Sequence, residues 1–370
     1  CYTAATGRTH HPHRLAVVAG NLQELRELLA TGDSEGIQRA EVKRGQQPTL
    51  AWVFADEGAH DAQMGRSLYE TEPVFRAAVQ RYSSIVEPLI GANLEHLLFP
   101  PVGELRSKSG SSTGDVVHAA IQCALAELLE SWGIHPEVVI GEGVGEYVAA
   151  YQAGLLNEAD LFELLSGHAD GGWPGEQLRP RSEGRRPCPR WLSTVTGRWI
   201  DETSTFAGDH WQRETRGPAR GQEARQRLDD AGISVMLEVG PSGSTLRHSR
   251  TSRGADSADW VTTLDVRHGE LHGILKAIGR LYLGGVGVDW QQFYSGRSCR
   301  RVALPTYPFQ RHRYWFEVAP AGEESLLGVA ADEPPAATAQ RLLGERIDDE
   351  WSPSLAELET RLGLDRGAYA

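Results

Sequence analysis

The chain has 370 residues, enough for one large domain or two to three smaller ones, and 40% of them are hydrophobic, which permits a sizeable core. A formal net charge of -13 argues against non-specific binding to nucleic acid or to an anionic membrane. The sequence has no run of about 18 apolar residues, so we expect no membrane span.

The four cysteines, Cys1, Cys123, Cys188 and Cys299, are scattered, with no C-x-x-C pair and no paired histidine spacing. This pattern argues against a disulfide framework or a zinc site and fits a reducing cytoplasm. No signal peptide is visible. Because the chain starts with cysteine rather than methionine, we expect it to be a piece of a longer protein.

The first part of the chain alternates predicted strands and helices. A short strand is predicted over residues 13–20 and an amphipathic helix over residues 21–30, where Asn21 can cap the helix and Glu24 stands in the capping-box position. A charged connection follows. Residues 49–55 then form a near-continuous apolar run, which is typical of a buried parallel strand.

Two helical patterns come next. After a loop at residues 56–65, apolar residues recur at helical spacing from Leu68 to Tyr82. Residues 107–114 are polar, and residues 115–133 give the strongest helical pattern in the chain, ended by Gly133.

Residues 136–150, PEVVIGEGVGEYVAA, predict a strand that enters a helix through a tight turn. Gly141, Gly143 and Gly145 have the G-x-S-x-G spacing of a nucleophile elbow, but the middle position holds glycine instead of a nucleophile. The order of helix, turn, strand, turn and helix indicates an α/β fold.

The remaining sequence changes character twice. Residues 166–190 are rich in Gly, Pro and Arg and predict an irregular loop. Order resumes with WLSTV, a helix near residues 222–231, a buried strand at 234–240 and a further helix. After Phe316 the composition becomes that of a linker, with a last predicted helix near the end of the chain.

Several segments, in order, resemble one family. The opening CYTAATGRTHHPHRLAVVAGNLQELRELL resembles the linker that follows a ketosynthase domain in modular type I polyketide synthases. AWVFADEGAHDAQMGRSLYETEPVFRAAV is similar to the start of the acyltransferase domain, which usually contains F-x-G-Q-G-x-Q. IQCALAELLESWGIHPEVVIGEGVGEYVAAYQAGLL resembles its elbow region, usually G-H-S-x-G-E. LSTVTGRWI, MLEVGPSGSTL and LGGVGVDWQQFY resemble its closing segments, and LPTYPFQRHRYWFE resembles the post-acyltransferase linker.

The resemblance implies an α/β-hydrolase-like core with a parallel sheet, preceded by a small α+β linker domain. An active member moves an acyl group, usually malonyl or methylmalonyl, from coenzyme A to the phosphopantetheine thiol of an acyl carrier protein. An elbow serine attacks, a distant histidine is the base, backbone amides form an oxyanion hole and an arginine holds the malonyl carboxylate. No resident cofactor or metal is implied.

The positions that match these functional residues are altered. The nucleophile falls on Gly143 and its neighbouring histidine on Glu142. The two glutamines near the oxyanion hole fall on Glu57 and His60, and the carboxylate-binding arginine falls on His168. The asparagine of the family's S-N-V-T-G falls on Thr194.

The chain is also shorter than the family pattern. Only 47 positions separate Gly145 from Leu192, where active relatives carry a ferredoxin-like subdomain with the catalytic H-x-F-H-S segment. Residues 166–190 are too few for that subdomain, because a βαβ unit alone takes about 30 residues. We therefore expect the subdomain to be largely missing and the base to be absent.

Other candidate groups have ordinary interpretations. Ser112 is central in GSSTG, but no predicted strand precedes it. Glu142 and Glu146 form a conceivable acid/base pair, although we favour a structural Glu146 and a tolerated surface charge at Glu142. His168 is a conceivable base in an exposed loop. A loose histidine cluster at residues 10, 11 and 13 lacks a carboxylate or cysteine that would complete a metal site.

Two groups of side chains suggest docking. The basic loop contains Arg179, Arg181, Arg185, Arg186 and Arg190, which we interpret as a solvated linker or as a patch for an acidic carrier protein. The tail offers Tyr307, Phe309, Arg311, Tyr314 and Trp315 as interface anchors.

We therefore expect an inactive acyltransferase-like domain that scaffolds the ketosynthase of the same synthase and receives a trans-acting acyltransferase or carrier protein. The alternative is an active acyltransferase with an unusual nucleophile, with Ser112, Ser242 and Cys188 as candidates. A third interpretation is a deleted or altered version of an active domain.

The expected segments are a ketosynthase–acyltransferase linker domain at 1–48, an acyltransferase-like domain at 49–302, a post-acyltransferase linker at 303–317 and a linker with a terminal helix at 318–370.

Overall fold

The structure is a computed structural model that describes residues 1–31, 36–43, 45, 47–56, 64–100, 112–167, 189–200, 220–241, 258–264 and 269–305. The chain divides into two units, Cys1–Pro305 and Thr306–Ala370, and all described residues belong to the first. The sequence predictions for the aromatic tail and the terminal helix lie outside the described residues.

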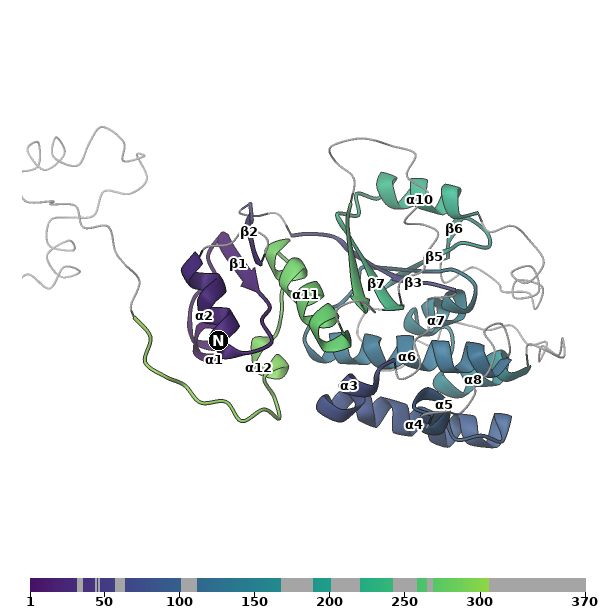
Figure 1. The fold of residues 1–370 in the computed structure, drawn as a ribbon. Coiled ribbons are helices and arrows are strands. Elements are labelled where there is room, and N and C mark those ends of the chain that lie inside the picture. Colours follow the sequence, from purple (N-terminus) through teal and green to yellow (C-terminus); the bar gives the residue numbers. More distant parts are fainter. Residues whose placement is uncertain are drawn as a thin grey trace, which may run out of the picture. The chain divides into compact units, whose positions relative to one another are not determined.

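A six-stranded sheet forms the centre of the first unit (Figure 1). Its strands, in spatial order, are β6 (Arg198–Ile200), β5 (Arg190–Ser193), β4 (Val138–Gly141), β3 (Leu50–Phe54), β7 (Val235–Pro241) and β8 (Asp259–Leu264). All neighbours are parallel except the β5–β6 pair at one edge. The predicted α/β fold with a parallel sheet is thus confirmed.

The side chains of the central strands alternate between two hydrophobic clusters. Trp52, Val139 and Leu237 face one cluster, whereas Val53, Ile140 and Met236 face the other. Both faces of the sheet are therefore buried, which explains why β3 and β4 appear in the sequence as continuous apolar runs. Helices cover both faces (Figure 1).

The larger cluster lies under most of the helices. These are α3 (Arg66–Thr71), α4 (Pro73–Ile90), α5 (Leu94–Leu98), α6 (Ser112–Ser131), α7 (Val144–Gln152) and α8 (Glu158–Gly167). The opposite face of the sheet carries α10 (Gly221–Asp230), whose Ala224 and Leu228 pack on it. Helix α6 is buried on nearly every side, since every residue from Val116 to Ala126 is buried.

The structure corrects several predicted boundaries. The helical pattern from Leu68 to Tyr82 is two helices, because Glu72 is extended and Pro73 starts α4. Strands β6 and β8 were not predicted. Helix α7 begins at Val144, so the last glycine of the predicted turn, Gly145, already belongs to the helix.

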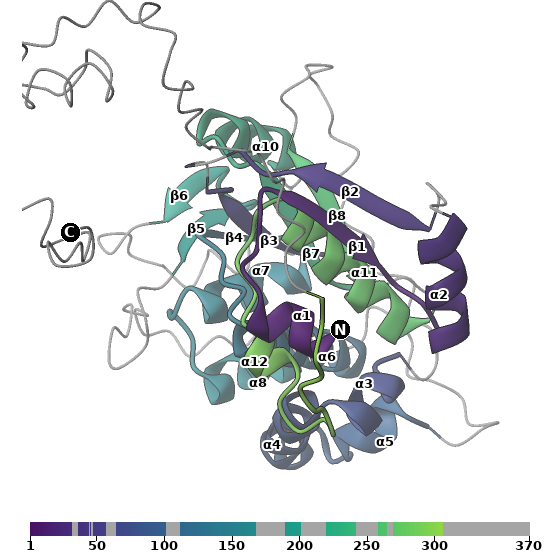
Figure 2. The same ribbon diagram turned by 90° about the vertical axis from the view of Figure 1, so that its left-hand side faces the viewer.

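The N-terminal segment builds a small α+β unit, which we call the linker unit: α1 (Tyr2–Gly7), β1 (His13–Val17), α2 (Leu22–Thr31) and β2 (Ile37–Glu41) (Figure 2). Strands β1 and β2 pair antiparallel, where the sequence predicted a charged connection in place of β2. The predicted cap is present, since Asn21 Oδ1 accepts from the Glu24 amide at 2.9 Å and Glu24 Oε2 accepts from the Gly20 amide at 2.8 Å.

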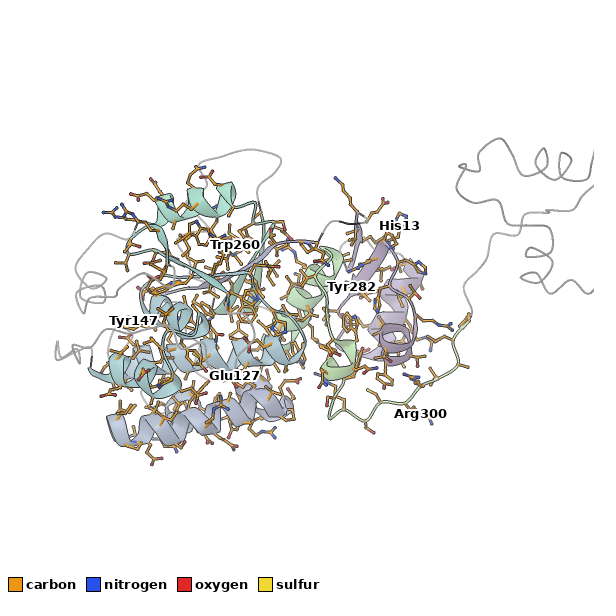
Figure 3. All side chains as sticks on the ribbon, turned by 180° about the vertical axis from the view of Figure 1, so that it is seen from behind. His13, Glu127, Tyr147, Trp260, Tyr282 and Arg300 are labelled. Carbon is orange, nitrogen blue, oxygen red and sulfur yellow. The ribbon has the colours of Figure 1, made fainter. Side chains whose placement is uncertain are left out.

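Two helices from the far end of the described chain pack on the linker unit: α11 (Glu270–Leu283) and α12 (Trp290–Phe293). The Arg14 guanidinium on β1 donates to the Tyr282 carbonyl at 2.6 Å and lies 4.5 Å from the centre of its ring. Tyr282 lies on α11, beside the linker unit (Figure 3). The ring of Tyr2 meets that of Tyr294 edge-on at 5.4 Å. The linker unit is thus attached through the C-terminal helices of the acyltransferase-like segment.

No helix among the described residues has the length and apolarity needed to span a bilayer.

Candidate functional site

The turn between β4 and α7 has the geometry of a nucleophile elbow. Gly143 lies at its tip with φ 53° and ψ -124°, a conformation that side-chain-bearing residues rarely adopt. In an active elbow this strained backbone presents the nucleophile. Here the turn is retained and glycine adopts it at low cost, because it has no Cβ.

The two flanking glycines are required by close packing. A Cβ on Gly141 would lie 2.0 Å from the Gly145 carbonyl oxygen, and a Cβ on Gly145 would lie 2.1 Å from the Phe54 carbonyl oxygen. The first turn of α7 therefore sits directly on the ends of β3 and β4. The G-x-G-x-G pattern belongs to the fold as well as to catalysis.

A carboxylate occupies the space in front of the elbow. Asp56 Oδ1 accepts a hydrogen bond from the Val144 amide at 2.8 Å. A Cβ placed on Gly143 would lie only 1.7 Å from this Oδ1. The amide after the nucleophile is the one that an active elbow contributes to its oxyanion hole.

Sequence analysis missed Asp56, although a signal was present. In the family pattern F-x-G-Q-G-x-Q, the first glycine falls on position 56, where this chain has aspartate. The aspartate at position 56 can be related to the missing nucleophile only in the folded structure, where Asp56 and Gly143 lie in contact.

Two side chains of α6 hold the turn that carries Asp56 in place. His118 Nε2 and Gln122 Nε2 both lie 2.9 Å from the Ala55 carbonyl oxygen and donate to it. Both side chains are buried. His118 Nε2 therefore points at a backbone carbonyl, not at the elbow tip.

The acidic residues of the elbow have structural surroundings. Glu146 is fully buried, and its Oε2 accepts from the Thr194 amide at 3.2 Å. Thr194 Oγ1 donates to the Gly141 carbonyl at 2.6 Å, so Thr194 links β5 to the elbow. Glu142 is only 6% exposed, so its interpretation as a surface charge was wrong.

The structure brings few of the other candidates to the elbow. Ser112 is the first residue of α6. His10 Nδ1 lies 2.8 Å from the Tyr282 hydroxyl, and His13 lies 3.9 Å from Glu41, both in or beside the linker unit. Arg190 begins β5, and its guanidinium lies 4.0 Å from the centre of the Trp199 ring. The remaining candidates, Glu57, His60, His168, Arg179, Arg181, Arg185, Arg186, Cys188, Ser242, Tyr307, Phe309, Arg311, Tyr314 and Trp315, lie outside the described residues.

A groove of about 700 Å³ lies on the linker unit, away from the elbow residues. It is bounded by α1, β1, α2, α11 and α12, and its lining includes Leu15, Leu22, Ile278, Tyr282 and Trp290. Leu22 is 71% exposed and Leu15 is 43% exposed, so apolar surface is left open here.

Comparison with known families agrees with this geometry. The family model for the acyl transferase domain matches residues 51–166, and a model named CurL-like, PKS C-terminal, matches residues 1–29. The acyl transferase match covers β3 to α8, including the elbow. It ends at the start of the predicted irregular loop.

Curated relatives are long polyketide synthases. The chain is 30% identical to the spectinabilin polyketide synthase system protein NorC of Streptomyces orinoci, over 98% of this chain and 18% of that protein. It is 29% identical to polyketide synthase GfsB of Streptomyces halstedii, over 90% of this chain and 8% of that protein. It is 26% identical to the PKS-NRPS hybrid synthetase ATPKS of Aspergillus niger, over 85% of this chain and 22% of that protein. The chain thus spans less than a quarter of the length of these relatives.

Solved structures show the same fold. The acyl transferase domain of ZmaA matches with a TM-score of 0.70 and 22% identity, covering 81% of this chain and 89% of that one. The acyltransferase domain from the second module of the salinomycin polyketide synthase matches with a TM-score of 0.67 and 22% identity, covering 80% and 89%. These likenesses show the fold. The acyl transferase family model that matches residues 51–166, together with the 30% identity to NorC over 98% of this chain, shows that the chain belongs to the acyl transferase domains of modular type I polyketide synthases.

Proposed function

We propose that this chain is a catalytically inactive acyltransferase domain that acts as a structural and docking module beside a ketosynthase. The observation that carries the proposal is Gly143 at the tip of a fully formed elbow. Glycine has no atom that can attack a thioester, so no acyl-enzyme can form at this position.

Magnitudes favour loss of activity over weakening. Removal of the serine or the histidine of a catalytic set costs on the order of a millionfold in rate. A surviving oxyanion hole contributes about a hundredfold to a thousandfold. An oxyanion hole stabilises the negative charge that forms when a nucleophile attacks, and Gly143 supplies no nucleophile. The Val144 amide, moreover, already donates to Asp56.

The alignments support the loss of a segment. The match to NorC runs over 419 positions, although this chain has only 370 residues. The relative therefore carries residues that have no counterpart here. We assign this difference to the subdomain that holds the catalytic histidine in active relatives, as the short distance from Gly145 to Leu192 indicates.

The linker unit supports the docking role. Its helix α2 exposes Leu22 and Leu29, which are seven residues apart and so lie on one face of the helix. Residues 1–29, which supply most of the groove, match a polyketide synthase model by themselves. The relatives are multidomain synthases, so we assign this surface to the ketosynthase of the same synthase. A trans-acting acyltransferase or acyl carrier protein would bind elsewhere, at the arginine loop or the aromatic tail.

The test of inactivity is transfer from malonyl-CoA to an acyl carrier protein, followed by mass spectrometry of the carrier. A serine-bearing acyltransferase domain is the positive control. We expect acylation of the carrier at the rate seen without any acyltransferase. Acylation above that rate by the purified chain would contradict the proposal.

The second candidate is an acyltransferase with an unusual nucleophile. One observation favours it: the Asp56 carboxylate lies where the side chain of an elbow nucleophile would be. Attack by a carboxylate on an acyl thioester would give a mixed anhydride on Asp56 and release the thiolate. Transfer that occurs in the native chain and vanishes in Asp56→Asn would support this candidate, and the same comparison with Ser112→Ala, Ser242→Ala or Cys188→Ala covers the other nucleophiles.

A further inference from the structure

We infer that Asp56 is a built-in occupant of the elbow: its carboxylate fills the volume left by the missing nucleophile and takes the amide that would otherwise face a substrate oxygen. This inference rests on the proposed loss of catalysis and adds how the emptied site is closed. Relative to the family pattern, position 56 has aspartate in place of glycine and position 143 has glycine in place of serine. The inference treats these two changes as coupled.

The first argument is steric. A Cβ on Gly143 would lie 1.7 Å from Asp56 Oδ1, 1.8 Å from its Cγ and 2.4 Å from Oδ2. Real Cβ atoms essentially never approach a heavy atom within 3.0 Å. A side chain at residue 143 would therefore force the exposed Asp56 carboxylate to move away and give up its hydrogen bond with the Val144 amide, whereas glycine at 56 with a serine at 143 is the combination of the family pattern.

The second argument is electrostatic. Helix α7 begins at Val144, and its N-cap residue Gly143 has no side chain that could satisfy the first amides. The N-terminus of a helix carries a partial positive charge and favours a carboxylate. Asp56 Oδ1 supplies that carboxylate by accepting from the Val144 amide. A capping group from the turn after β3 replaces one that the elbow itself lacks.

The third argument is positional. Asp56 directly follows Ala55, whose carbonyl accepts from both His118 and Gln122 at 2.9 Å. Two donors on one buried carbonyl fix the direction of the chain where it leaves β3. The carboxylate is thus delivered to the elbow by an anchored turn.

The inference predicts that restoring a serine at Gly143 fails unless Asp56 is removed as well. The test is a double-mutant cycle read by thermal unfolding, with Gly143→Ser, Asp56→Gly and the double variant. We expect Gly143→Ser to lower Tm by about 5 °C or more, because both the positive φ and Asp56 oppose it. In the Asp56→Gly background the same serine should cost clearly less.

A matched control isolates backbone strain. Gly91 also has a positive φ, 68°, and an added Cβ there meets nothing within 4 Å. Gly91→Ser therefore reports the cost of a positive φ without a steric contact, in the milder left-handed conformation with ψ 19°. The cost of Gly143→Ser, at ψ -124°, should exceed that of Gly91→Ser in the native background and fall toward it when Asp56 is glycine.

Two further variants cover the case in which Asp56→Gly fails to fold. Asp56→Ala shortens the side chain and should relieve Gly143→Ser, whereas Asp56→Asn keeps the shape and should not. Additive effects in both cycles would overturn the closure by Asp56 and leave the proposed inactivity untouched. A malonyl group found on Asp56 after incubation with malonyl-CoA would instead contradict both.

Discussion

The three elbow glycines show how one sequence pattern can arise from different physical needs. Gly141 and Gly145 are required by atoms of neighbouring backbone within about 2 Å of an added Cβ. Gly143 is required by its positive φ and by Asp56. The sequence was sufficient to predict the turn and the missing nucleophile. It was not sufficient to predict the Asp56 contact, since that depends on two strand ends meeting in space.

The link between Thr194 and the elbow is testable at the same scale. Thr194 is 2% exposed and donates to the Gly141 carbonyl at 2.6 Å. Thr194→Val leaves that buried carbonyl without this donor, so we expect a loss of about 1–3 kcal/mol in the free energy of unfolding. Urea denaturation measures it.

The matched control for this substitution is Thr71→Val. Thr71 Oγ1 also donates to a backbone carbonyl at 2.6 Å, but the site is exposed and water can replace the hydroxyl. Its cost should stay within about 0.5 kcal/mol. Equal losses at the two positions would argue against a special role of Thr194 at the elbow.

At the scale of elements, prediction succeeded where burial produces a strong pattern. Strands β3, β4 and β7 are entirely buried; β3 and β4 gave continuous apolar runs, and the run of β7 is interrupted only by Glu238. Strand β2, IQRAE, is only partly buried and carries two charges, so its pattern resembles a loop. Strand β6 has three residues, none of them buried, and is recognisable only by its pairing with β5.

Helices α4, α6 and α8 are joined by a polar cluster. Arg81 on α4 contacts Glu127 on α6 at 2.5 Å and Glu158 on α8 at 3.0 Å. The hydroxyl of Tyr82 donates to Glu127 from a fully buried position. Burial first, and then the neighbouring Cys123, Tyr151 and Glu127, raise the pKa of Tyr82 well above its ordinary value of 10.0.

This raised pKa predicts a loss of stability at alkaline pH. The unfolded chain releases the Tyr82 proton near pH 10 while the folded chain keeps it, so the free energy of unfolding falls as pH rises above that value. The contribution is fully present below pH 10 and declines by up to about 1.4 kcal/mol per pH unit. Urea denaturation between pH 8 and pH 11 should show a shallower decline in Tyr82→Phe. An unchanged slope would mean that Tyr82 ionises as readily in the folded state.

At the scale of the whole molecule, the linker unit and the sheet share α11. That helix follows the last strand in sequence, yet its residue Tyr282 binds Arg14 of β1. The predicted boundary at residue 48 therefore separates the chain by sequence but not by contact. Long-range packing of this kind leaves no pattern in the local sequence. The sequence therefore predicted the order of the elements but not the packing of α11 on the linker unit.

The proposed ketosynthase surface predicts a change in binding without a change in stability. Leu22→Glu on α2 replaces a 71% exposed leucine in the groove and should weaken co-purification with the ketosynthase by about tenfold, as expected for a lost interface anchor. Leu89→Glu on α4 is the control, because Leu89 is 42% exposed and lies outside the groove. Equal binding by the two variants would remove the linker unit as the docking surface.

The central claim is that this polypeptide cannot carry an acyl group at its elbow. Intact-mass spectrometry after incubation with malonyl-CoA or methylmalonyl-CoA tests it without assuming which residue would react. We expect the mass of the unmodified chain at every time point. A covalent acyl adduct that forms on the folded protein and disappears when carrier protein is added would contradict the account.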